Sequence, residues 1–219
     1  MEENSFDDQF DEFDFFDFVL NSINFLDLCG CILEDEDCLE ISRGLKENKY
    51  FKKLDFTNCL ISDEGIKTLC EGIEKNQFLK EIIFSNNNFE IVGTHSLCQS
   101  LLKVTSLEKL DFSFLISDEI VAQDLSEYLG SNLNNLKEID LSFCNFKENG
   151  AKKIFESLKK NTVLKKIFLE SFEVDEKTQK TISEMLIENK TLKEIRLCKF
   201  SDISIYDSFK KNTSLVYFF

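Results

Sequence analysis

The sequence predicts an α/β repeat solenoid, because a regular spacing, a strand pattern and a helix pattern coincide along it. A segment of the form Leu/Phe-x-x-Leu/Ile-x-Leu/Phe recurs every 28 or 29 residues, and only the last step, of 23, is shorter. A fixed period of about 20 to 50 residues is the signature of a repeat solenoid. Each period predicts one strand and one helix. The segments begin at Ile23, Phe51, Leu79, Leu107, Leu136, Leu164, Leu192 and Leu215.

Residues 51–78 show how the strand half of a repeat is built. Leu54 and Phe56 alternate with Asp55 and Thr57. This period of two predicts a short strand with one face toward the core. Cys59 then continues the inward set around the bend.

The helix half of the same repeat has a start signal, an apolar stripe and an end signal. Ser62 precedes two acidic residues, a pattern that caps a helix start. Ile66, Leu69 and Ile73 recur at helical spacing. Asn76 is expected to end the helix in a left-handed conformation.

Two further features specify the type of repeat. The pattern L-x-x-L-x-L-x-x-C/N-x-L is followed by a glycine near place fifteen and by a helix that ends in Asn. This pattern resembles the ribonuclease-inhibitor type of leucine-rich repeat over residues 23–219, best in 51–78 and 136–163. The resemblance implies a curved horseshoe with strands on its concave face and helices on its convex face. The segments LKENKYFKKL and LIENKTLKEI are also similar to those of tropomodulin leucine-rich domains and of innate-immune receptors.

The negative charge is concentrated at the amino terminus. The chain carries a net charge of −15, and residues 1–22 contain eight acidic residues and no Lys or Arg, so the remainder carries −15 + 8 = −7. This charge argues against a nucleic-acid partner, which requires cationic contacts to phosphate. It is compatible with a basic protein partner, although acidic solubility is the more general interpretation.

Targeting signals are not evident in the sequence. No apolar run approaches the roughly 20 residues of a membrane span. The amino terminus has acidic residues where a secretory signal has basic ones. We therefore expect a cytoplasmic protein, with the nucleus as the alternative, and no membrane partner.

Residues 1–22 form a separate segment ahead of the repeat domain at 23–219. Phe6, Phe10, Phe13, Phe16 and Leu20 lie on one helical stripe. One interpretation is a cap helix that covers the first repeat, which terminal repeats require. The other is an acidic-aromatic motif that folds on a partner.

The sequence predicts no enzyme, no metal site and no cofactor. Cys31, Cys59 and Cys144 all occupy the ninth place of their repeats, where a small apolar residue packs inside. His95 is the single histidine and is expected on the surface at a helix start. The seven glycines are expected at bends and helix ends, and none forms a phosphate-binding loop.

The repeat pattern weakens in its second half. The ninth place holds Leu115, Phe172 and Phe200 in three repeats, so the side-chain bonding of Cys or Asn is lost there. The seventh repeat is short, which predicts a shortened helix around Tyr206 and Phe209. Residues 215–219 would form a strand with a bare edge, which would allow edge-to-edge self-association.

A ligand is expected on the concave face, to which strand places three and five point. Place three alternates Lys and Glu over its middle repeats, which predicts cross-strand charge pairs. Place five is less balanced and ends in apolar and aromatic groups. The predicted protein-binding residues are Asp55, Ile83, Asp111, Phe114, Asp140, Phe143, Phe168 and Arg196.

Phe114 and Phe143 occupy place eight of neighbouring repeats, at the start of the bend. If exposed, this pair is the best candidate for a binding hot spot. The alternative is that both rings tuck into the core. The leading functional hypothesis is a protein-interaction module. The alternatives, implied by resemblance, are a Ran-type GTPase-activating regulator, for which Arg43 and Arg196 are the only arginines, and a tropomodulin-like actin regulator.

Overall fold

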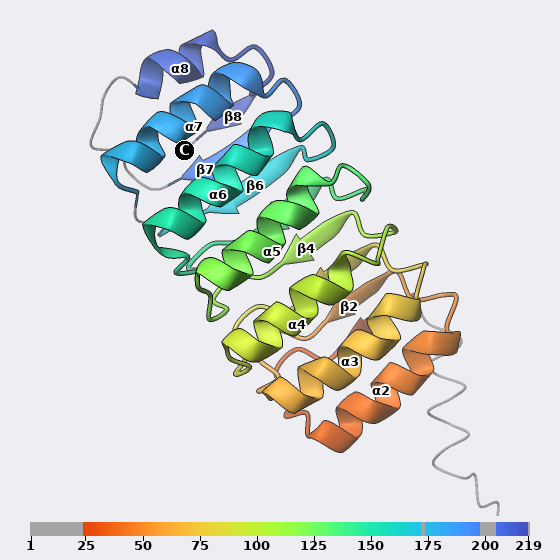
Figure 1. Cartoon of the computed structure of the whole chain (residues 1–219). Coiled ribbons are helices and arrows are strands. Elements are labelled where there is room, and N and C mark those ends of the chain that lie inside the picture. The colour runs from red at the N-terminus through yellow and green to blue at the C-terminus, as the bar shows by residue number, and fades with distance from the viewer. Residues whose placement is uncertain (1–23, 172–173, 198–204, 219) are drawn as a thin grey trace, which may run out of the picture.

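Figure 1 shows the computed structural model, which describes residues 24–171, 174–197 and 205–218. Strands and helices alternate along this part of the chain. The strands are β1 (Phe25–Asp27), β2 (Lys53–Asp55), β3 (Glu81–Ile83), β4 (Lys109–Asp111), β5 (Glu138–Asp140), β6 (Lys166–Leu169), β7 (Glu194–Leu197) and β8 (Tyr217–Phe218). The helices are α2 (Asp35–Glu47), α3 (Asp63–Lys75), α4 (Ile91–Leu101), α5 (Glu119–Gly130), α6 (Lys147–Lys160), α7 (Glu176–Glu188) and α8 (Ile205–Lys211).

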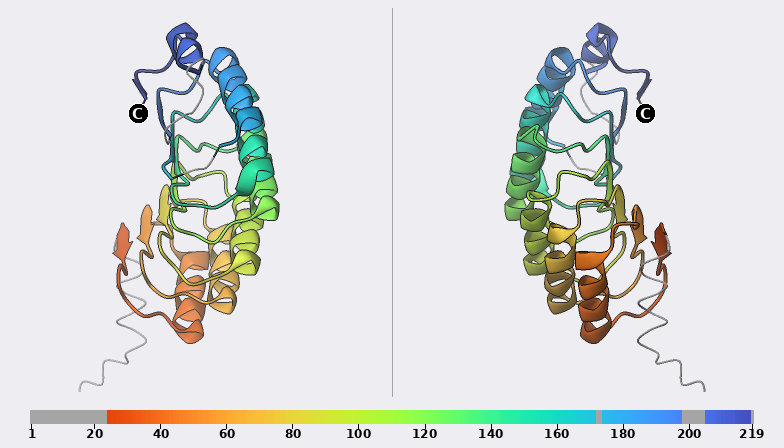
Figure 2. Two further views of the ribbon diagram at one scale, coloured as in Figure 1. Left: turned by 90° about the vertical axis from the view of Figure 1, so that its left-hand side faces the viewer. Right: turned by 90° about the vertical axis from the view of Figure 1, so that its right-hand side faces the viewer.

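The strands form one parallel sheet in which β1 to β8 follow one another in chain order. Every strand therefore pairs with the same strand of the next repeat. Figure 2 shows the helices as a second layer, on the outer side of a gently curved stack. The predicted α/β solenoid is confirmed, and its curvature places the exposed face of the sheet on the inner side.

The core lies between the two layers. The middle residue of each strand from β2 to β7 is buried, as for Leu54, Leu110 and Ile167. Phe56 and Phe84 stack inside it with ring centroids 5.2 Å apart. Each repeat thus buries its apolar side chains against both neighbours, which is why a solenoid repeat is stable only within a stack.

The helix starts agree with the sequence pattern. Ser62 precedes α3, and its hydroxyl accepts a hydrogen bond from the backbone N–H of Gly65 at 3.0 Å. Gly93 is the equivalent residue in the first turn of α4, and it permits close approach between repeats. A Cβ on Gly93 would lie 2.5 Å from Asp63 Oδ1 and 2.7 Å from Ile66 Cγ2. Gly72 lies inside α3 rather than at a bend or helix end. A Cβ there would lie 2.5 Å from the backbone oxygen of Ser42, so the close contact between α2 and α3 requires glycine.

The expectation that Asn76 adopts a left-handed conformation is wrong. Its φ of −82° and ψ of 118° are extended. The residue is required for its buried side chain, whose Nδ2 donates to the carbonyl oxygens of Leu45 and Asn48, each at 2.9 Å. Its Oδ1 accepts from the backbone N–H groups of Phe78 and Leu79.

At the ends of α3, α6, α7 and α8 an asparagine side chain thus joins the helix to the previous repeat and to the next strand, whereas the caps of α4 and α5 are Leu102 and Ser131. Asn189 repeats all four contacts, with its Nδ2 bonding Leu158 and Asn161 of the repeat before it. We call this set the asparagine ladder, and within the described residues it comprises Asn48, Asn76, Asn161, Asn189 and Asn212.

The ninth place also bonds between repeats where it is Cys or Asn. Cys59 Sγ donates to the carbonyl oxygen of Leu28 at 3.0 Å, and Asn87 Nδ2 donates to that of Phe56 at 2.6 Å. Leu115 packs in the core without such a bond. Cys31, in contrast to the buried position expected for it, is exposed, because no described repeat precedes it.

The end of the described stack is thinner than its middle. Helix α8 has 7 residues, against 13 in α7, so the predicted shortening is confirmed. Strand β8 pairs only with β7 among the described residues, and self-association through this edge stays a prediction. The expectations for residues 1–22, Phe172, Phe200 and Phe219 lie outside the described residues. None of the described helices is long and apolar enough to cross a membrane.

Candidate functional site

The third place of the repeat forms a charge-balanced row across the concave face. The strand register aligns Lys53 with Glu81 and continues this alternation to Glu194. Lys53 Nζ lies 2.9 Å from Glu81 Oε1, and Lys166 bridges Glu138 and Glu194 at 3.4 and 3.6 Å. The predicted cross-strand pairing is confirmed, and this row has little charge left for a ligand.

The fifth place forms a contiguous row that is not balanced. The strand register places its members side by side from β1 to β7, so the predicted place-five residues lie together. The row reads Asp27, Asp55, Ile83, Asp111, Asp140, Phe168 and Arg196.

The aspartates of this row have a local structural role that the sequence did not reveal. Asp111 Oδ1 accepts from the backbone N–H of Ser113 at 2.8 Å and from its hydroxyl at 2.6 Å. Asp55 and Asp140 accept from the residue two positions ahead in the same way. Each carboxylate thus holds the bend that follows its strand, as short polar side chains do in turns.

Asp111 and Asp140 are nevertheless a like-charged pair in direct register. Such a pair is unfavourable. Burial, and then the charges of Asp140 and Asp55, raise the pKa of Asp111 above its ordinary value, although hydrogen bonds from Ser113 act in the opposite direction. A cation placed between the two carboxylates would relieve this repulsion.

Place eight imposes a backbone requirement that the sequence analysis missed. Its residue has a positive φ in each of the first six repeats: 78° at Gly30, 55° at Asn58, 56° at Asn86, 62° at Phe114, 61° at Phe143 and 58° at Ser171. Glycine and asparagine tolerate this left-handed region, whereas a bulky side chain there is a conformational outlier. Phenylalanine is therefore an unfavourable choice for the backbone at two consecutive repeats.

Phe114 and Phe143 are exposed, which excludes the interpretation that they tuck into the core. Their exposed fractions are 51% and 45%. The two rings stack with centroids 4.3 Å apart and an interplanar angle of 7°. Ile116, at place ten, is also 49% exposed, and sequence reasoning missed it because the chain no longer alternates with period two in the bend. We call the stacked pair, Phe114 and Phe143, the aromatic patch.

The far end of the place-five row is occupied by a cation–π contact. The guanidinium carbon of Arg196 lies 4.6 Å from the Phe168 ring centroid. Its Nη2 also donates to Glu194 Oε1 at 3.0 Å. Arg196 is thus paired within the chain.

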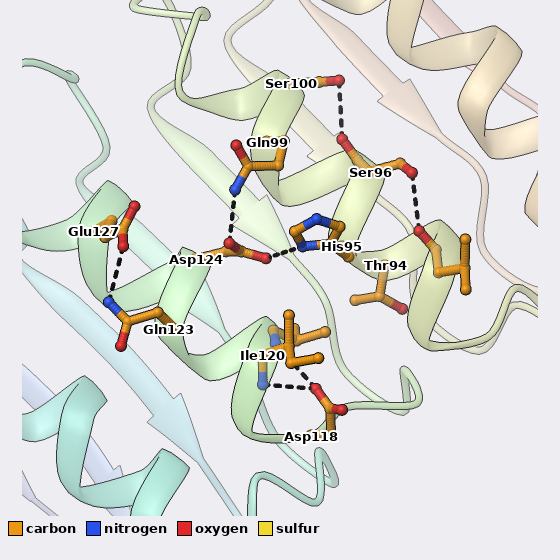
Figure 3. Close-up of polar contacts among 12 residues, drawn as sticks. Thr94, His95, Ser96, Gln99, Ser100, Asp118, Ile120, Gln123, Asp124 and Glu127 are labelled. Carbon is orange, nitrogen blue, oxygen red and sulfur yellow. Dashed lines mark hydrogen bonds and ion pairs between the residues drawn. The ribbon is translucent and has the colours of Figure 1, made fainter.

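His95 belongs to a polar contact between helices rather than to the concave face. Figure 3 shows its side chain on α4 pointing toward Asp124 of α5. His95 Nδ1 lies 2.5 Å from Asp124 Oδ2, and Gln99 Nε2 donates to Asp124 Oδ1 at 2.6 Å. Both oxygens of the buried Asp124 carboxylate thus have a polar partner on α4. His95 and Gln99 therefore have a structural role, joining α4 to α5.

The buried cysteines have the properties of core residues. Burial raises the pKa of Cys144 to about 12 and that of Cys59 to about 11. Thiols with such pKa values are unreactive near neutral pH. Among the described residues, no three His, Cys, Asp or Glu side chains are grouped to hold a metal ion.

A comparison with protein families finds the leucine-rich repeat twice in the chain. The family described as "Leucine Rich repeat" matches residues 47–70 and 132–155. Both matches begin near a helix end and run through the next strand into the following helix, which is the unit seen in the structure. The chain therefore contains leucine-rich repeats and has the fold of a leucine-rich-repeat solenoid. No curated protein matches the sequence.

Solved structures with a similar arrangement have low sequence identity. The structure of the TLR13–ssRNA13 complex has a TM-score of 0.53 and 16% identity, and the match covers 90% of this chain and 29% of that one. The tropomodulin C-terminal domain of Caenorhabditis elegans has a TM-score of 0.49 and 11% identity, with 82% and 93% covered. Leiomodin-1 actin-binding site 2 has a TM-score of 0.34 and 12% identity, with 92% and 89% covered.

Proposed function

We propose that this protein is a protein-interaction module, not an enzyme, and that it binds a protein ligand at the carboxyl-terminal ends of β4 and β5. One observation carries the proposal. Two phenylalanines occupy consecutive left-handed positions, and their stacked rings are about half exposed. A left-handed conformation costs a residue such as Phe roughly 1–2 kcal/mol.

A residue that is unfavourable for its backbone conformation and is also exposed is a reason to look for a function at that position. Asn58 and Asn86 show that the same place accepts a residue suited to this backbone. The rings are exposed, so core packing does not require them. Exposed aromatic side chains supply much of the binding energy of protein interfaces.

The aspartate pair beside the aromatic patch indicates the chemistry of the ligand. Asp111 and Asp140 face the concave side in direct register, and their mutual repulsion favours a cation between them. We propose that the ligand presents a basic side chain to this pair and an apolar surface to Phe114 and Phe143. Ile83 and Phe168 extend the apolar contact on either side of the aspartates.

The test uses a double variant that suits the backbone. Phe114→Asn with Phe143→Asn replaces the rings by the residue found at this place in repeats two and three. Proteins retained by the wild type are identified by affinity capture from native lysate, and the affinity of each purified candidate is then measured by calorimetry. We expect the double variant to lose at least about tenfold in affinity, since hot-spot residues contribute more than about 1 kcal/mol each.

A control separates this loss from a general loss of exposed apolar surface. Leu133 is 80% exposed in the loop before β5, at the opposite end of the strands. Leu133→Asn should leave the affinity unchanged. Equal affinity of the wild type and the double variant for every retained partner would refute the proposal.

A further inference from the structure

The second place of the repeat carries a row of lysines at the amino-terminal ends of the strands. This end of the strands lies opposite the aromatic patch, so the row is a surface separate from the proposed ligand site. From β2 to β7 the place is lysine in five of six repeats. The row, which we call the lysine row, comprises Lys52, Lys80, Lys137, Lys165 and Lys193, with Glu108 between the second and third lysines.

Backbone hydrogen bonds run directly along this row and establish its register. The N–H of Lys80 donates to the carbonyl oxygen of Lys52, and that of Glu108 donates to Lys80, both at 2.8 Å. The bonds continue from Lys137 to Glu108, from Lys165 to Lys137 and from Lys193 to Lys165. Since neighbouring strands lie about 4.8 Å apart, the six positions span about 24 Å in a single file.

The charges of this row are only partly neutralised within the described residues. Glu108 pairs with both Lys80 and Lys137, at 3.1 and 2.6 Å. Lys52, Lys165 and Lys193 are exposed and form no ion pair with any described residue. Lys52 instead lies over the Phe78 ring, with Nζ 5.2 Å from its centroid.

The adjacent place-three row shows that this imbalance is not a consequence of composition. Over the same six strands, place three holds three lysines and three glutamates, which cancel. The lysine row has five lysines and one glutamate, a net charge of +4, in a chain whose net charge is −15. Positive charge is therefore concentrated at one edge of an acidic protein.

Helix electrostatics accounts for some nearby lysines but not for this row. Lys46, Lys75 and Lys160 lie in the last turns of their helices, where a cation offsets the negative end of the helix dipole. Lys52 lies five residues beyond the end of α2, and the dipole effect is confined to the terminal turn. The row therefore needs another reason to be basic.

We propose that the lysine row binds an extended, acidic segment of a partner protein. Charge complementarity is the ground for this choice of occupant. An extended strand that covers 24 Å contains about seven residues, and its alternate side chains face one way about 6.7 Å apart. Such a segment presents three or four carboxylates to the row, with its other side chains free to contact exposed rings such as Phe78 and Tyr50.

The test compares two triple variants with the same change in net charge. Lys52→Gln/Lys165→Gln/Lys193→Gln removes the unpaired lysines of the row. Lys67→Gln/Lys152→Gln/Lys180→Gln removes three exposed lysines from helices α3, α6 and α7. The probe is a fluorescein-labelled oligoglutamate peptide, with its affinity measured by fluorescence anisotropy on the full chain at several salt concentrations.

We expect the row variant to lose about tenfold in affinity for oligoglutamate, because three exposed ion pairs at about 0.5 kcal/mol each are removed. The helix variant should lose less than about twofold, and binding should weaken with salt. The Phe114→Asn/Phe143→Asn variant should bind the peptide like the wild type, so this proposal and the proposed function fail independently.

Three results would overturn the inference. The first is the absence of measurable binding of oligoglutamate to the wild type at low salt. The second is equal weakening by both triple variants, which would reduce the effect to net charge. The third is tighter binding of a single-stranded oligonucleotide than of a peptide with the same number of charges, which would assign the row to nucleic acid.

Discussion

The chain changes direction between sheet and helix at both ends of the strands, but different residues stabilise the two bends. At the amino-terminal ends of most strands, the buried asparagine ladder holds the chain from inside, so the bend does not depend on the exposed side chain at place two. At the carboxyl-terminal ends, the exposed place-eight residue itself adopts the left-handed conformation of the bend. An exposed residue at the first end therefore reports surface chemistry, whereas at the second end it must also satisfy the backbone.

Because of this difference, the lysine row and the aromatic patch are unusual in different ways. The lysine row stands out by its charge, since any polar residue would serve the fold there. Phe114 and Phe143 stand out because the fold would be better served by Asn or Gly. Four measurements test this difference between the two ends of the strands.

The largest effect is expected from the buried amide at the amino-terminal ends. Asn76→Ala removes four hydrogen bonds and leaves backbone groups of two repeats unsatisfied, so the free energy of unfolding should fall by about 3 kcal/mol. Urea unfolding followed by circular dichroism measures this change. Asn149→Ala is the control, because Asn149 is exposed on α6 and bonds one side chain, Glu119. Similar effects of the two variants would contradict the role assigned to the ladder.

The second effect tests close packing near the carboxyl-terminal ends. Gly93→Ala places a methyl group within 3 Å of Asp63, Ile66 and Phe89 and should lower the free energy of unfolding by about 1–3 kcal/mol. Gly130→Ala is matched to it, because the nearest atom to its new methyl group is Ser157 Cβ at 3.8 Å. That variant should be as stable as the wild type or more stable, by up to about 1 kcal/mol. The same urea unfolding experiment compares both, and a Gly93→Ala protein as stable as the wild type would show that the repeats can move apart.

The third measurement concerns the stability of the binding variant. In Phe114→Asn/Phe143→Asn, relief of left-handed strain of about 1 kcal/mol per residue offsets the loss of ring stacking, about 0.5–1.5 kcal/mol. We expect the free energy of unfolding to stay within about 1 kcal/mol of the wild type in urea titrations. A loss above about 2 kcal/mol would mean that the aromatic pair supports the fold, and the surface would lose its functional interpretation.

The smallest effects distinguish two aspartates by the sign of their pH dependence. The pKa of Asp111 is raised, so the folded state retains its proton more strongly, and stability falls as pH rises from the ordinary value through the folded-state pKa. Asp111→Asn should therefore stabilise the protein at neutral pH and lose this advantage in acid. Hydrogen bonds from Thr178 lower the pKa of Asp175, so its contribution is present at neutral pH and is lost as pH falls.

Asp175→Asn accordingly serves as the opposite case and should destabilise at neutral pH but not in acid. Thermal unfolding of both variants between acid and neutral pH provides the comparison. Shifts of the same sign would show that the charge repulsion between Asp111 and Asp140 is not significant.

Much of the fold could be predicted because every repeat shows the same spacing of apolar residues. Residues such as Leu54, Ile66 and Ser62 act through local periodicity and capping, which depend on sequence neighbours only. The side-by-side placement of Asp111 and Asp140 also followed, since a constant period aligns equal places. The role of Asn76 could not be predicted correctly, because its partners Leu45 and Asn48 belong to the preceding repeat.

The repeat period alone specifies that this chain is a stack of strand–helix repeats, and it specifies which side chains share a row. The folded structure was needed to show that place eight is left-handed, that Phe114 and Phe143 stack in exposed positions, and that three lysines of the row form no ion pair with a described residue. A period specifies only which positions are equivalent. Backbone conformation, ring stacking and ion pairing depend instead on contacts between repeats that lie far apart in the chain.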